Sequence, residues 1–190
     1  MMNLIREEVM NAIESRISEQ AVQHYLIAID GRCAAGKTTL AETLQKKYNC
    51  NVIHMDDFYL RPEQRTKERY KEPGGNIDYE RFLVEVLIPL KEGRAFSYCP
   101  YDCKTQTMGE CLMVEPKLLT IVEGSYSCHP KFREYYDMHI FLDVDADEQL
   151  RRIRKRGGEE ALQMFRAKWI PLEEAYIRAN RLEECCRYLR

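Results

Sequence analysis

The sequence lacks a long apolar run and a secretory signal. Across its 190 residues, no stretch approaches the roughly 18–20 consecutive apolar residues that a membrane helix requires. The amino-terminal stretch, MMNLIREEVM, carries acidic residues where a signal peptide has a basic region followed by an apolar run. We therefore expect a cytoplasmic protein that has no membrane partner.

An excess of charge of either sign is also missing. The chain has 29 Lys and Arg residues against 31 Asp and Glu residues, so its formal net charge is −2. A dedicated nucleic-acid binder would carry a strong basic excess, and we expect no nucleic-acid partner. The apolar fraction of 45% excludes a disordered polymer. Because internal repeats and low-complexity linkers are absent, residues 1–190 are expected to form a single domain.

Cysteine is abundant, but its spacing is not that of a zinc site. No C-x-x-C pair occurs among the eight cysteines. A chain of this length can bury a core without disulfides, and disulfides belong mainly to secreted proteins. We expect reduced thiols that pack as small apolar side chains. The cysteines are Cys33, Cys50, Cys99, Cys103, Cys111, Cys128, Cys185 and Cys186.

Short apolar runs alternate with helical patterns along the chain. Ile5, Val9, Ile13 and Ile17 follow one another at four-residue steps, as in an amphipathic helix over residues 4–17. Apolar runs typical of strands buried on both faces occur at residues 25–29, 52–55, 118–122 and 140–144. Helical patterns occupy residues 38–48, 79–91, 146–156 and 160–180, with Pro89 and Pro171 inside two of them. This order predicts an α/β fold with a mostly parallel sheet.

Several segments have weaker patterns. Residues 61–75 are densely charged and lack apolar periodicity, which predicts either a solvated loop or a flap that closes over a substrate. Residues 95–115 are rich in aromatic residues and cysteine, and we expect a small antiparallel excursion there. The last ten residues are compatible with a helix or with a short edge strand.

The strongest motif is a phosphate-binding loop. The run GRCAAGKT at residues 31–38 fits G-x-x-x-x-G-K-[ST], and it lies between an apolar strand and a helix, as this motif requires. In such a loop backbone N–H groups cradle phosphate oxygens, the lysine reaches the β- and γ-phosphates, and the next hydroxyl binds Mg²⁺. The residues expected to bind the nucleotide are Gly31, Ala34, Ala35, Gly36, Lys37, Thr38 and Thr39.

Carboxylates follow two of the predicted strands. Asp56 and Asp57 come after the strand at 52–55, and Glu123 closes the strand at 118–122. Ligands bind at the carboxyl ends of the strands in an open parallel sheet. There a carboxylate can deprotonate an attacking hydroxyl or hold hydrated Mg²⁺. The alternatives are a turn or helix cap for the two aspartates, and an ordinary loop position for Glu123.

With these residues together, the sequence resembles the uridine kinase-like P-loop small-molecule kinases, whose relatives include phosphoribulokinase and pantothenate kinase. The resemblance covers roughly residues 25–156. It rests on the family order of GRCAAGKTT, MDDFYL, NIDYERF, YDCKTQT, IVEGSYS and an arginine-rich helix. It implies a three-layer P-loop fold with a helical lid, ATP and Mg²⁺ as cofactors, and a small-molecule acceptor.

The resemblance also implies roles for individual residues. Asp56 matches the general base, Lys37 the catalytic lysine, and Arg152 and Arg156 the lid arginines that neutralise charge during transfer. The substrate-binding positions would be Asp56, Asp78 for the ribose hydroxyls, Tyr101 near the base, and Gln106. Thr38 and Glu123 would hold the metal. Where uridine kinases have a histidine that reads the pyrimidine, this chain has Gln106, and a nearby arginine becomes Met108.

The basic run at residues 151–156, Arg-Arg-Ile-Arg-Lys-Arg, has two interpretations. It is either a solvated helix face or part of a phosphate-clamping lid at about 151–160, hinged at Gly157 and Gly158. The phosphate loop favours the lid.

We therefore expect a kinase that moves the γ-phosphoryl group of ATP to a hydroxyl of a small metabolite, with a nucleoside 5′-hydroxyl favoured. The absence of an N-K-x-D element argues against a GTPase. The alternatives are a kinase for a pantothenate-like or sugar-like alcohol, a non-catalytic ATP-binding regulator, and an ATPase stimulated by nucleic acid. A homo-oligomer is compatible with the sequence.

Overall fold

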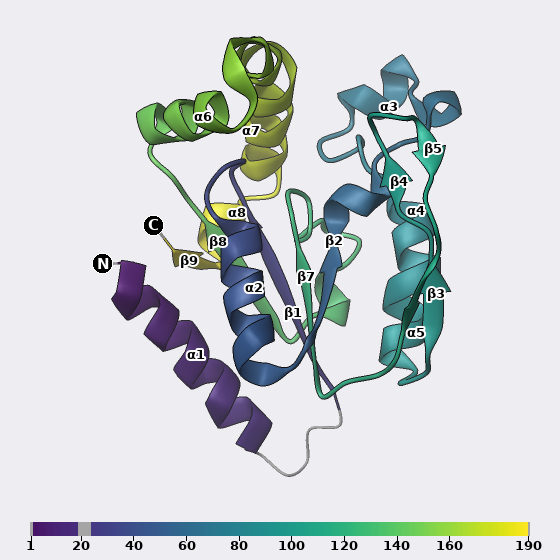
Figure 1. Ribbon diagram of the computed structural model, residues 1–190, viewed down its shortest axis with the longest axis vertical. Helices are drawn as coiled ribbons and strands as arrows, with labels where there is room; N and C mark the ends of the chain where they lie inside the picture. Colours follow the sequence, from purple (N-terminus) through teal and green to yellow (C-terminus); the bar gives the residue numbers. More distant parts are fainter. Residues whose placement is uncertain (1, 19–23, 190) are drawn as a thin grey trace.

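A five-stranded parallel sheet runs through the centre of the molecule, with helices on both of its faces (Figure 1). The computed structural model describes the backbone of residues 2–18 and 24–189 and the side chains of 7–18 and 24–187. The strand order is β2-β7-β1-β8-β9. The strands are β1 (Tyr25–Gly31), β2 (Asn51–His54), β7 (Leu119–Glu123), β8 (Met138–Leu142) and β9 (Arg187–Leu189).

The predicted parallel sheet is therefore confirmed, with strands that extend beyond their apolar runs. In the centre, Ile27 of β1 lies between Ile121 of β7 and Met138 of β8. β1 and β7 continue through the polar residues Asp30 and Glu123, which the surrounding segments bury. This extension brings charged side chains to the carboxyl ends of buried strands.

Alternate side chains of β1 pack into two different cores. Ile27 and Ile29 face one core together with the buried side chains of α1 (Met2–Ser18) and α2 (Lys37–Tyr48). Val9 and Ile13 of α1 are buried there and Ile17 packs beside them, whereas the side chain of Ile5 lies outside the described residues. The opposite face of β1 packs against the helical segment of residues 79–91 and the carboxyl-terminal helices.

Each long helical segment on the second face contains a π-helical turn just before a proline. The segment at 79–91 is α4 (Tyr79–Phe82), η3 (Leu83–Leu87) and α5 (Ile88–Lys91), with Pro89 in the first turn of α5. The later segment is α6 (Ala146–Met164), η5 (Phe165–Trp169) and α7 (Ile170–Ala179), with Pro171 placed in the same way. Proline lacks an N–H and crowds the carbonyl four residues earlier, and the wider turn relieves that crowding without ending the helix. At Gly158, where a break was expected, α6 has non-helical angles of φ 77° and ψ −171°.

The expected excursion consists of two small antiparallel pairs. β3 (Phe96–Tyr98) pairs with β6 (Leu112–Val114), and β4 (Tyr101–Asp102) pairs with β5 (Thr107–Met108) between them. The prediction that all cysteines are reduced is wrong here, because Cys99 and Cys111 form a disulfide. They come directly after and before the paired residues Tyr98 and Leu112, so the hairpin holds them opposite each other. Cys33, Cys50 and Cys128 are free and buried, as expected.

The charged stretch at 61–75 is more regular than its sequence pattern predicts. After η1 (Met55–Phe58) the chain forms the short helices η2 (Pro62–Gln64) and α3 (Lys67–Lys71). Arg69 holds the end of this stretch, because its guanidinium donates to the Gly75 and Ile77 carbonyls and pairs with Glu80 at 2.7 Å. Two short helices therefore interrupt the expected solvated loop, and its role as a flap stays a prediction.

The carboxyl-terminal residues combine the two conformations that the sequence left open. There α8 (Leu182–Cys185) leads into β9. Earlier in the chain, the short 3-10 turn η4 (Arg133–Tyr135) precedes β8. β9 lies beside β8, with Ile140 opposite Arg187, and so forms one edge of the sheet. Among the described residues, no helix has the length and apolar character needed to cross a membrane.

The first glycine of the phosphate loop is required by the sheet itself. Gly31 has φ +139°, and a Cβ at this position would lie 2.0 Å from the carbonyl oxygen of Leu142 in β8. We expect Gly31→Ala to lower the free energy of unfolding by more than about 3 kcal/mol, through both strain and overlap. Gly36→Ala is the matched control, because Gly36 also has a positive φ (+101°) but open space around its Cβ. Urea unfolding of both variants measures the difference; equal losses would contradict the steric explanation.

A buried histidine makes the stability depend on pH. His129 is 2% exposed and stacks on Tyr79 at 5.0 Å. Burial, followed by the positive charges of Lys131 and Arg69, lowers its pKa from 6.5 to about 4. Below pH 6.5 the unfolded chain therefore binds a proton that the folded protein excludes. The contribution of this group to the free energy of unfolding is fully present above pH 6.5 and is lost as the pH falls toward 4.

We expect the wild type to lose about 2 kcal/mol between pH 7 and pH 5 through this group, from 1.36 kcal/mol per pKa unit. His129→Phe should remove that part of the pH dependence, whatever its effect on absolute stability. Urea unfolding at the two pH values tests this, and parallel pH curves for both proteins would contradict it.

Candidate active site

A cavity of about 310 Å³ opens at the carboxyl ends of β1, β2 and β7. It joins the phosphate loop, the segments after β2 and β7, and the helices at the carboxyl-terminal end. Its lining residues are Cys33, Ala34, Gly36, Lys37, Thr38, Thr39, Asp56, Tyr59, Glu123, Gly124, Ser125, Arg152, Arg156, Phe165 and Glu173.

The phosphate loop curls between β1 and α2. Ala34 (φ 61°) and Gly36 (φ 101°) have positive φ angles, and α2 begins at Lys37 immediately after them. The start of a helix concentrates backbone N–H groups and the positive end of the helix dipole, which together favour an anion. Gly31 and Ala35, also predicted to bind the nucleotide, belong to the same loop but do not line the cavity.

Lys37 is buried beneath the loop, with its ammonium group at the cavity. Its Nζ donates to the Gly31 carbonyl at 2.7 Å and the Arg32 carbonyl at 3.0 Å, and it lies 3.3 Å from Ser125 Oγ. These contacts hold the extended side chain against the loop. The charge faces the place where phosphate oxygens would enter.

Thr38 and Glu123 meet across the cavity. The threonine Oγ1 is 3.2 Å from Glu123 Oε1 and 3.3 Å from Oε2. His54 Nδ1 lies 2.6 Å from Glu123 Oε1, and this hydrogen bond raises the pKa of the imidazole. A hydroxyl and a carboxylate side by side are donors that Mg²⁺ accepts, and Mg²⁺ commonly takes its other ligands from phosphates and water. The described residues contain no cluster of three or more His, Cys, Asp or Glu side chains able to hold a metal alone.

Asp56 and Asp57, adjacent in η1, lie in different surroundings. Asp56 lines the cavity, where its side chain is accessible although protein surrounds it on most sides. Desolvation raises its pKa, and nearby Glu123 and Glu173 act in the same direction, against Lys37. Asp57 instead accepts a hydrogen bond from Tyr98 at 3.2 Å and does not line the cavity. Gly124 allows η1 to approach, since a Cβ there would lie 3.0 Å from that of Met55.

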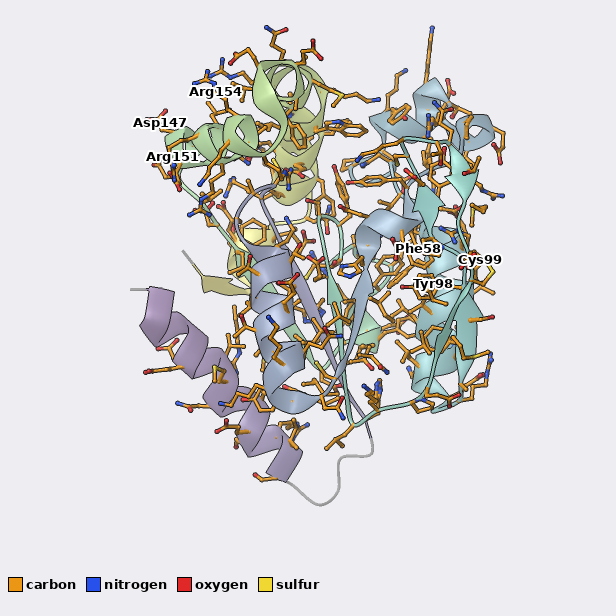
Figure 2. The ribbon with its side chains drawn as sticks, in the orientation of Figure 1. Phe58, Tyr98, Cys99, Asp147, Arg151 and Arg154 are labelled. Carbon is orange, nitrogen blue, oxygen red and sulfur yellow. A yellow bond between two sulfur atoms is a disulfide. The ribbon has the colours of Figure 1, made fainter. Side chains whose placement is uncertain are left out.

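The arginine-rich helix has two different faces. Arg152 and Arg156, one turn apart on α6, line the cavity, and Arg152 Nη1 donates to the Ala34 carbonyl at 3.0 Å. Arg151 and Arg154 lie on the outer side of this helix (Figure 2) and form exposed ion pairs with Glu148 and Glu159. Arg151 and Arg154 therefore fit the solvated face, whereas Arg152 and Arg156 line the cavity, and the phosphate-clamping lid stays a prediction.

The remaining predicted substrate residues lie outside the cavity. Asp78 is buried, and its carboxylate accepts from the Arg81 N–H at 3.1 Å and from Gln64 Nε2 at 2.8 Å. Tyr101 is also buried, and its hydroxyl accepts from Arg65 at 2.9 Å. Gln106 is exposed at the β4–β5 turn with φ 57°. Beside this hairpin, Phe58 and Tyr98 pack ring to ring at 5.2 Å, next to Cys99 (Figure 2).

Sequence reasoning missed several lining residues. Ser125 lies in the EGSYS segment, two residues after Glu123, and this closeness in the sequence could have identified it. Tyr59 likewise lies close to Asp56 in the sequence, three residues after it. Glu173 and Phe165 belong to a helical region that reads as ordinary amphipathic sequence, and only the fold brings them to the phosphate loop. The cavity thus combines three cations, Lys37, Arg152 and Arg156, with three carboxylates, Asp56, Glu123 and Glu173.

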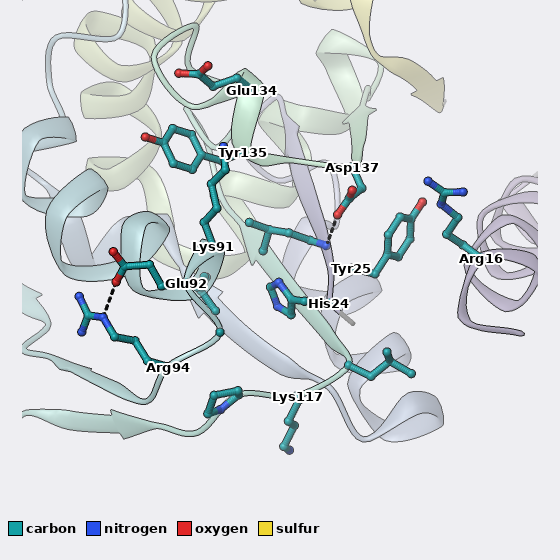
Figure 3. Close-up of a pocket in the computed structure, with 15 residues that line it drawn as sticks. Arg16, His24, Tyr25, Lys91, Glu92, Arg94, Lys117, Glu134, Tyr135 and Asp137 are labelled. Atoms are coloured by element: carbon teal, nitrogen blue, oxygen red, sulfur yellow. Dashed lines mark hydrogen bonds and ion pairs between the residues drawn. The ribbon is translucent and has the colours of Figure 1, made fainter. Parts of the chain in front are cut away.

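A second and larger cavity, of about 790 Å³, opens at the opposite, amino ends of the strands (Figure 3). Several of its polar groups are engaged with protein partners. Arg94 pairs with Glu92, Asp137 accepts the Leu26 N–H at 2.8 Å, and the ammonium group of Lys91 lies 5.1 Å from the Tyr135 ring. The described residues that line it include no part of the phosphate loop, so the smaller cavity is the candidate active site.

Comparisons with known proteins agree with this geometry. Residues 27–169 match the family model described as "AAA domain". A uridine kinase of Halalkalibacterium halodurans is 29% identical over 170 residues, which cover 80% of this chain and 79% of that protein. A uridine kinase of Proteus mirabilis is 32% identical over 158 residues, covering 76% and 73%.

The fold has a close counterpart among solved structures. A possible uridine kinase from Bacillus stearothermophilus superimposes with a TM-score of 0.74, covering 98% of this chain and 99% of that one at 18% identity. The structural likeness supports the fold, and the identity to the curated relatives over most of both chains supports the descent. The matched family model and these relatives agree with the phosphate loop at the head of the cavity. The chain therefore belongs to the uridine kinase-like family of P-loop kinases.

Proposed function

We propose that this protein transfers the γ-phosphoryl group of ATP to a hydroxyl group of a small metabolite, first among them the 5′-hydroxyl of a nucleoside. One observation carries the proposal: a single cavity holds the phosphate-loop lysine, the Thr38–Glu123 pair, Asp56 and two lid arginines. These groups match what phosphoryl transfer needs, which is a cradle for phosphates, a metal site and a base for the acceptor.

In this proposal each residue acts on a different part of the reaction. The loop N–H groups and Lys37 bind the β- and γ-phosphates. Asp56 accepts the proton of the acceptor hydroxyl as its oxygen bonds to the γ-phosphorus, and the bond to the bridging oxygen breaks to release ADP. A Mg²⁺ ion held by Thr38 and Glu123 supplies charge neutralisation at the phosphates.

The lid arginines neutralise the charge that spreads over the transferred group. Arg156 suits this role because it lines the cavity and stacks beside the Phe165 ring at 5.8 Å, with no ion pair to a carboxylate among the described residues. Arg152 shares its charge with Glu148 at 2.7 Å and can turn toward an incoming phosphate. Guanidinium groups form strong, paired hydrogen bonds with phosphate oxygens.

The nucleoside acceptor is supported by the uridine kinases among the relatives and by the order of the motifs. A second candidate, a non-nucleoside alcohol, is favoured by the substrate side. There both carboxylate oxygens of Asp78 already accept hydrogen bonds, and Gln106 lies on an exposed turn away from the cavity. Both candidates use the same phosphoryl chemistry and differ only in the acceptor.

The role of Asp56 is tested with its neighbour as control. We expect Asp56→Asn to lower turnover by about 10²- to 10⁴-fold while ATP affinity stays nearly unchanged, because only the proton acceptor is lost. Asp57→Asn removes a like charge one residue away that does not line the cavity, and it should keep near wild-type turnover. Steady-state kinetics and ATP titration measure both; near-normal turnover of Asp56→Asn would exclude it as the base.

The pH profile provides a second test of the same group. Because desolvation raises the pKa of Asp56 above 3.8, the proton acceptor is lost at a higher pH than for an exposed aspartate. We expect kcat/KM to fall as the pH decreases through the raised pKa of Asp56. Stopped assays from pH 4 to pH 8 would show this decrease on the acidic side of the profile. A flat profile down to pH 4 would contradict the assignment.

The acceptor is identified by ADP release from Mg-ATP with a panel of nucleosides, vitamins and sugar alcohols, with DNA and RNA wells included. A rise with uridine or cytidine supports the nucleoside kinase, and a rise with another alcohol selects the second candidate. ATP binding without any acceptor-dependent release would support a nucleotide sensor, and a rise with nucleic acid would support an ATPase of that class.

A further inference from the structure

Glu173 is a buried carboxylate on α7 whose partners lie in the phosphate loop and the segment after β7. It is 6% exposed, yet it lines the active-site cavity. Its Oε2 accepts the backbone N–H of Cys33 at 3.0 Å, and its Oε1 accepts the hydroxyl of Ser125 at 2.7 Å. One side chain therefore ties the helix to both walls of the cavity.

The contact continues from Ser125 to the loop lysine. Ser125 Oγ lies 3.3 Å from Lys37 Nζ, whose other partners are the loop carbonyls of Gly31 and Arg32. The hydroxyl thus donates to Glu173 and can accept from the ammonium group. Lys37, Ser125 and Glu173 form a relay that begins at the expected phosphate site and ends on the helix that follows the lid.

The same helix continues from η5, which connects it to α6 and to the predicted lid at about 151–160. Trp169, the single tryptophan of the chain, closes η5 directly before α7. Its ring lies 6.0 Å from that of Tyr59, which lines the cavity. Within a continuous helix, a shift of Glu173 changes the position of Trp169 one turn away.

We infer that Glu173 is a positioning residue for phosphoryl transfer, and that its hydrogen bonds to Ser125 and Cys33 couple the occupied phosphate loop to the lid. The inference rests on the proposed ATP site. Nucleotide phosphates that draw Lys37 away from Ser125 change the contacts of the hydroxyl that donates to Glu173, and α7 transmits this change to the lid.

The other attachments of α7 do not reach the cavity. Glu174 pairs with Arg32 at 2.6 Å, and Arg32 also pairs with Asp143 and Glu183. Tyr176 donates to the buried Asp30 at 2.8 Å. These contacts hold the helix on the fold, and only Glu173 among these three lines the cavity.

Trp169 makes the coupling measurable without an acceptor. In the wild type we expect a change of tryptophan fluorescence when Mg²⁺ and a non-hydrolysable ATP analogue bind, with binding measured separately by calorimetry. Glu173→Ala should still bind the analogue but lose the fluorescence response. In turnover with the identified acceptor, its kcat should fall about 10- to 100-fold at a nearly unchanged KM for ATP, as expected for misplaced groups.

Three further variants separate positioning from general stability. Glu173→Gln keeps an acceptor for Cys33 and a polar partner for Ser125, so it should restore most of the response. Ser125→Ala breaks the relay without exposing the Cys33 N–H, and it should lose the response even if Glu173→Ala folds poorly. Glu174→Gln, the adjacent control, should respond as the wild type does, because Arg32 retains two carboxylates.

The outcomes distinguish this inference from the proposed function. If the wild type does not bind the analogue, the ATP site itself is wrong and the coupling fails with it. If the wild type binds and responds but Glu173→Ala or Ser125→Ala responds equally, the ATP site stands and the role of Glu173 is overturned. Loss of the response in Glu173→Gln as well would also overturn it, because the effect would then lie in charge rather than in hydrogen bonds.

Discussion

The buried carboxylate of Asp30 holds together the segments from which the candidate active site is built. It is 1% exposed and accepts hydrogen bonds from the backbone N–H groups of Gly31, Tyr126 and Cys128 and from the hydroxyl of Tyr176. These donors belong to the phosphate loop, to the segment after β7 and to α7. A buried carboxylate without such partners costs several kcal/mol, so the relative placement of the three segments is strongly determined.

This placement explains why six charged groups can share one small cavity. The carboxyl ends of parallel strands meet at one edge of the sheet, which brings Glu123 to the phosphate loop and sets Asp56 beside it. Desolvation raises the pKa of Asp56, the like charges of Glu123 and Glu173 act in the same direction, and Lys37 opposes them. Triphosphate and Mg²⁺ would add both signs of charge, and in the proposed reaction Arg152 and Arg156, which line the cavity, would neutralise the added anion.

Much of this could be predicted from the sequence, because it depends on local pattern. The apolar runs located four strands of the sheet to within two residues, and the glycines and lysine of the loop predicted the position of the candidate nucleotide site. The disulfide between Cys99 and Cys111 could not be predicted, since their opposition depends on the pairing of β3 with β6. The short helices at 61–75 were missed because capping and guanidinium contacts, rather than apolar periodicity, stabilise them.

By itself the sequence determined the α/β architecture, the phosphate loop with Lys37 and Thr38, and the carboxylates that follow the strands. Hydrophobic periodicity and backbone chemistry depend on residues that are close together in the sequence, so they can be recognised from the sequence alone. Only the tertiary structure decided that Arg152 and Arg156 face the cavity, that Asp78 and Gln106 lie outside it, and that Glu173 reaches Cys33. That last contact joins residues 140 positions apart, and such contacts arise only when separate elements pack against one another.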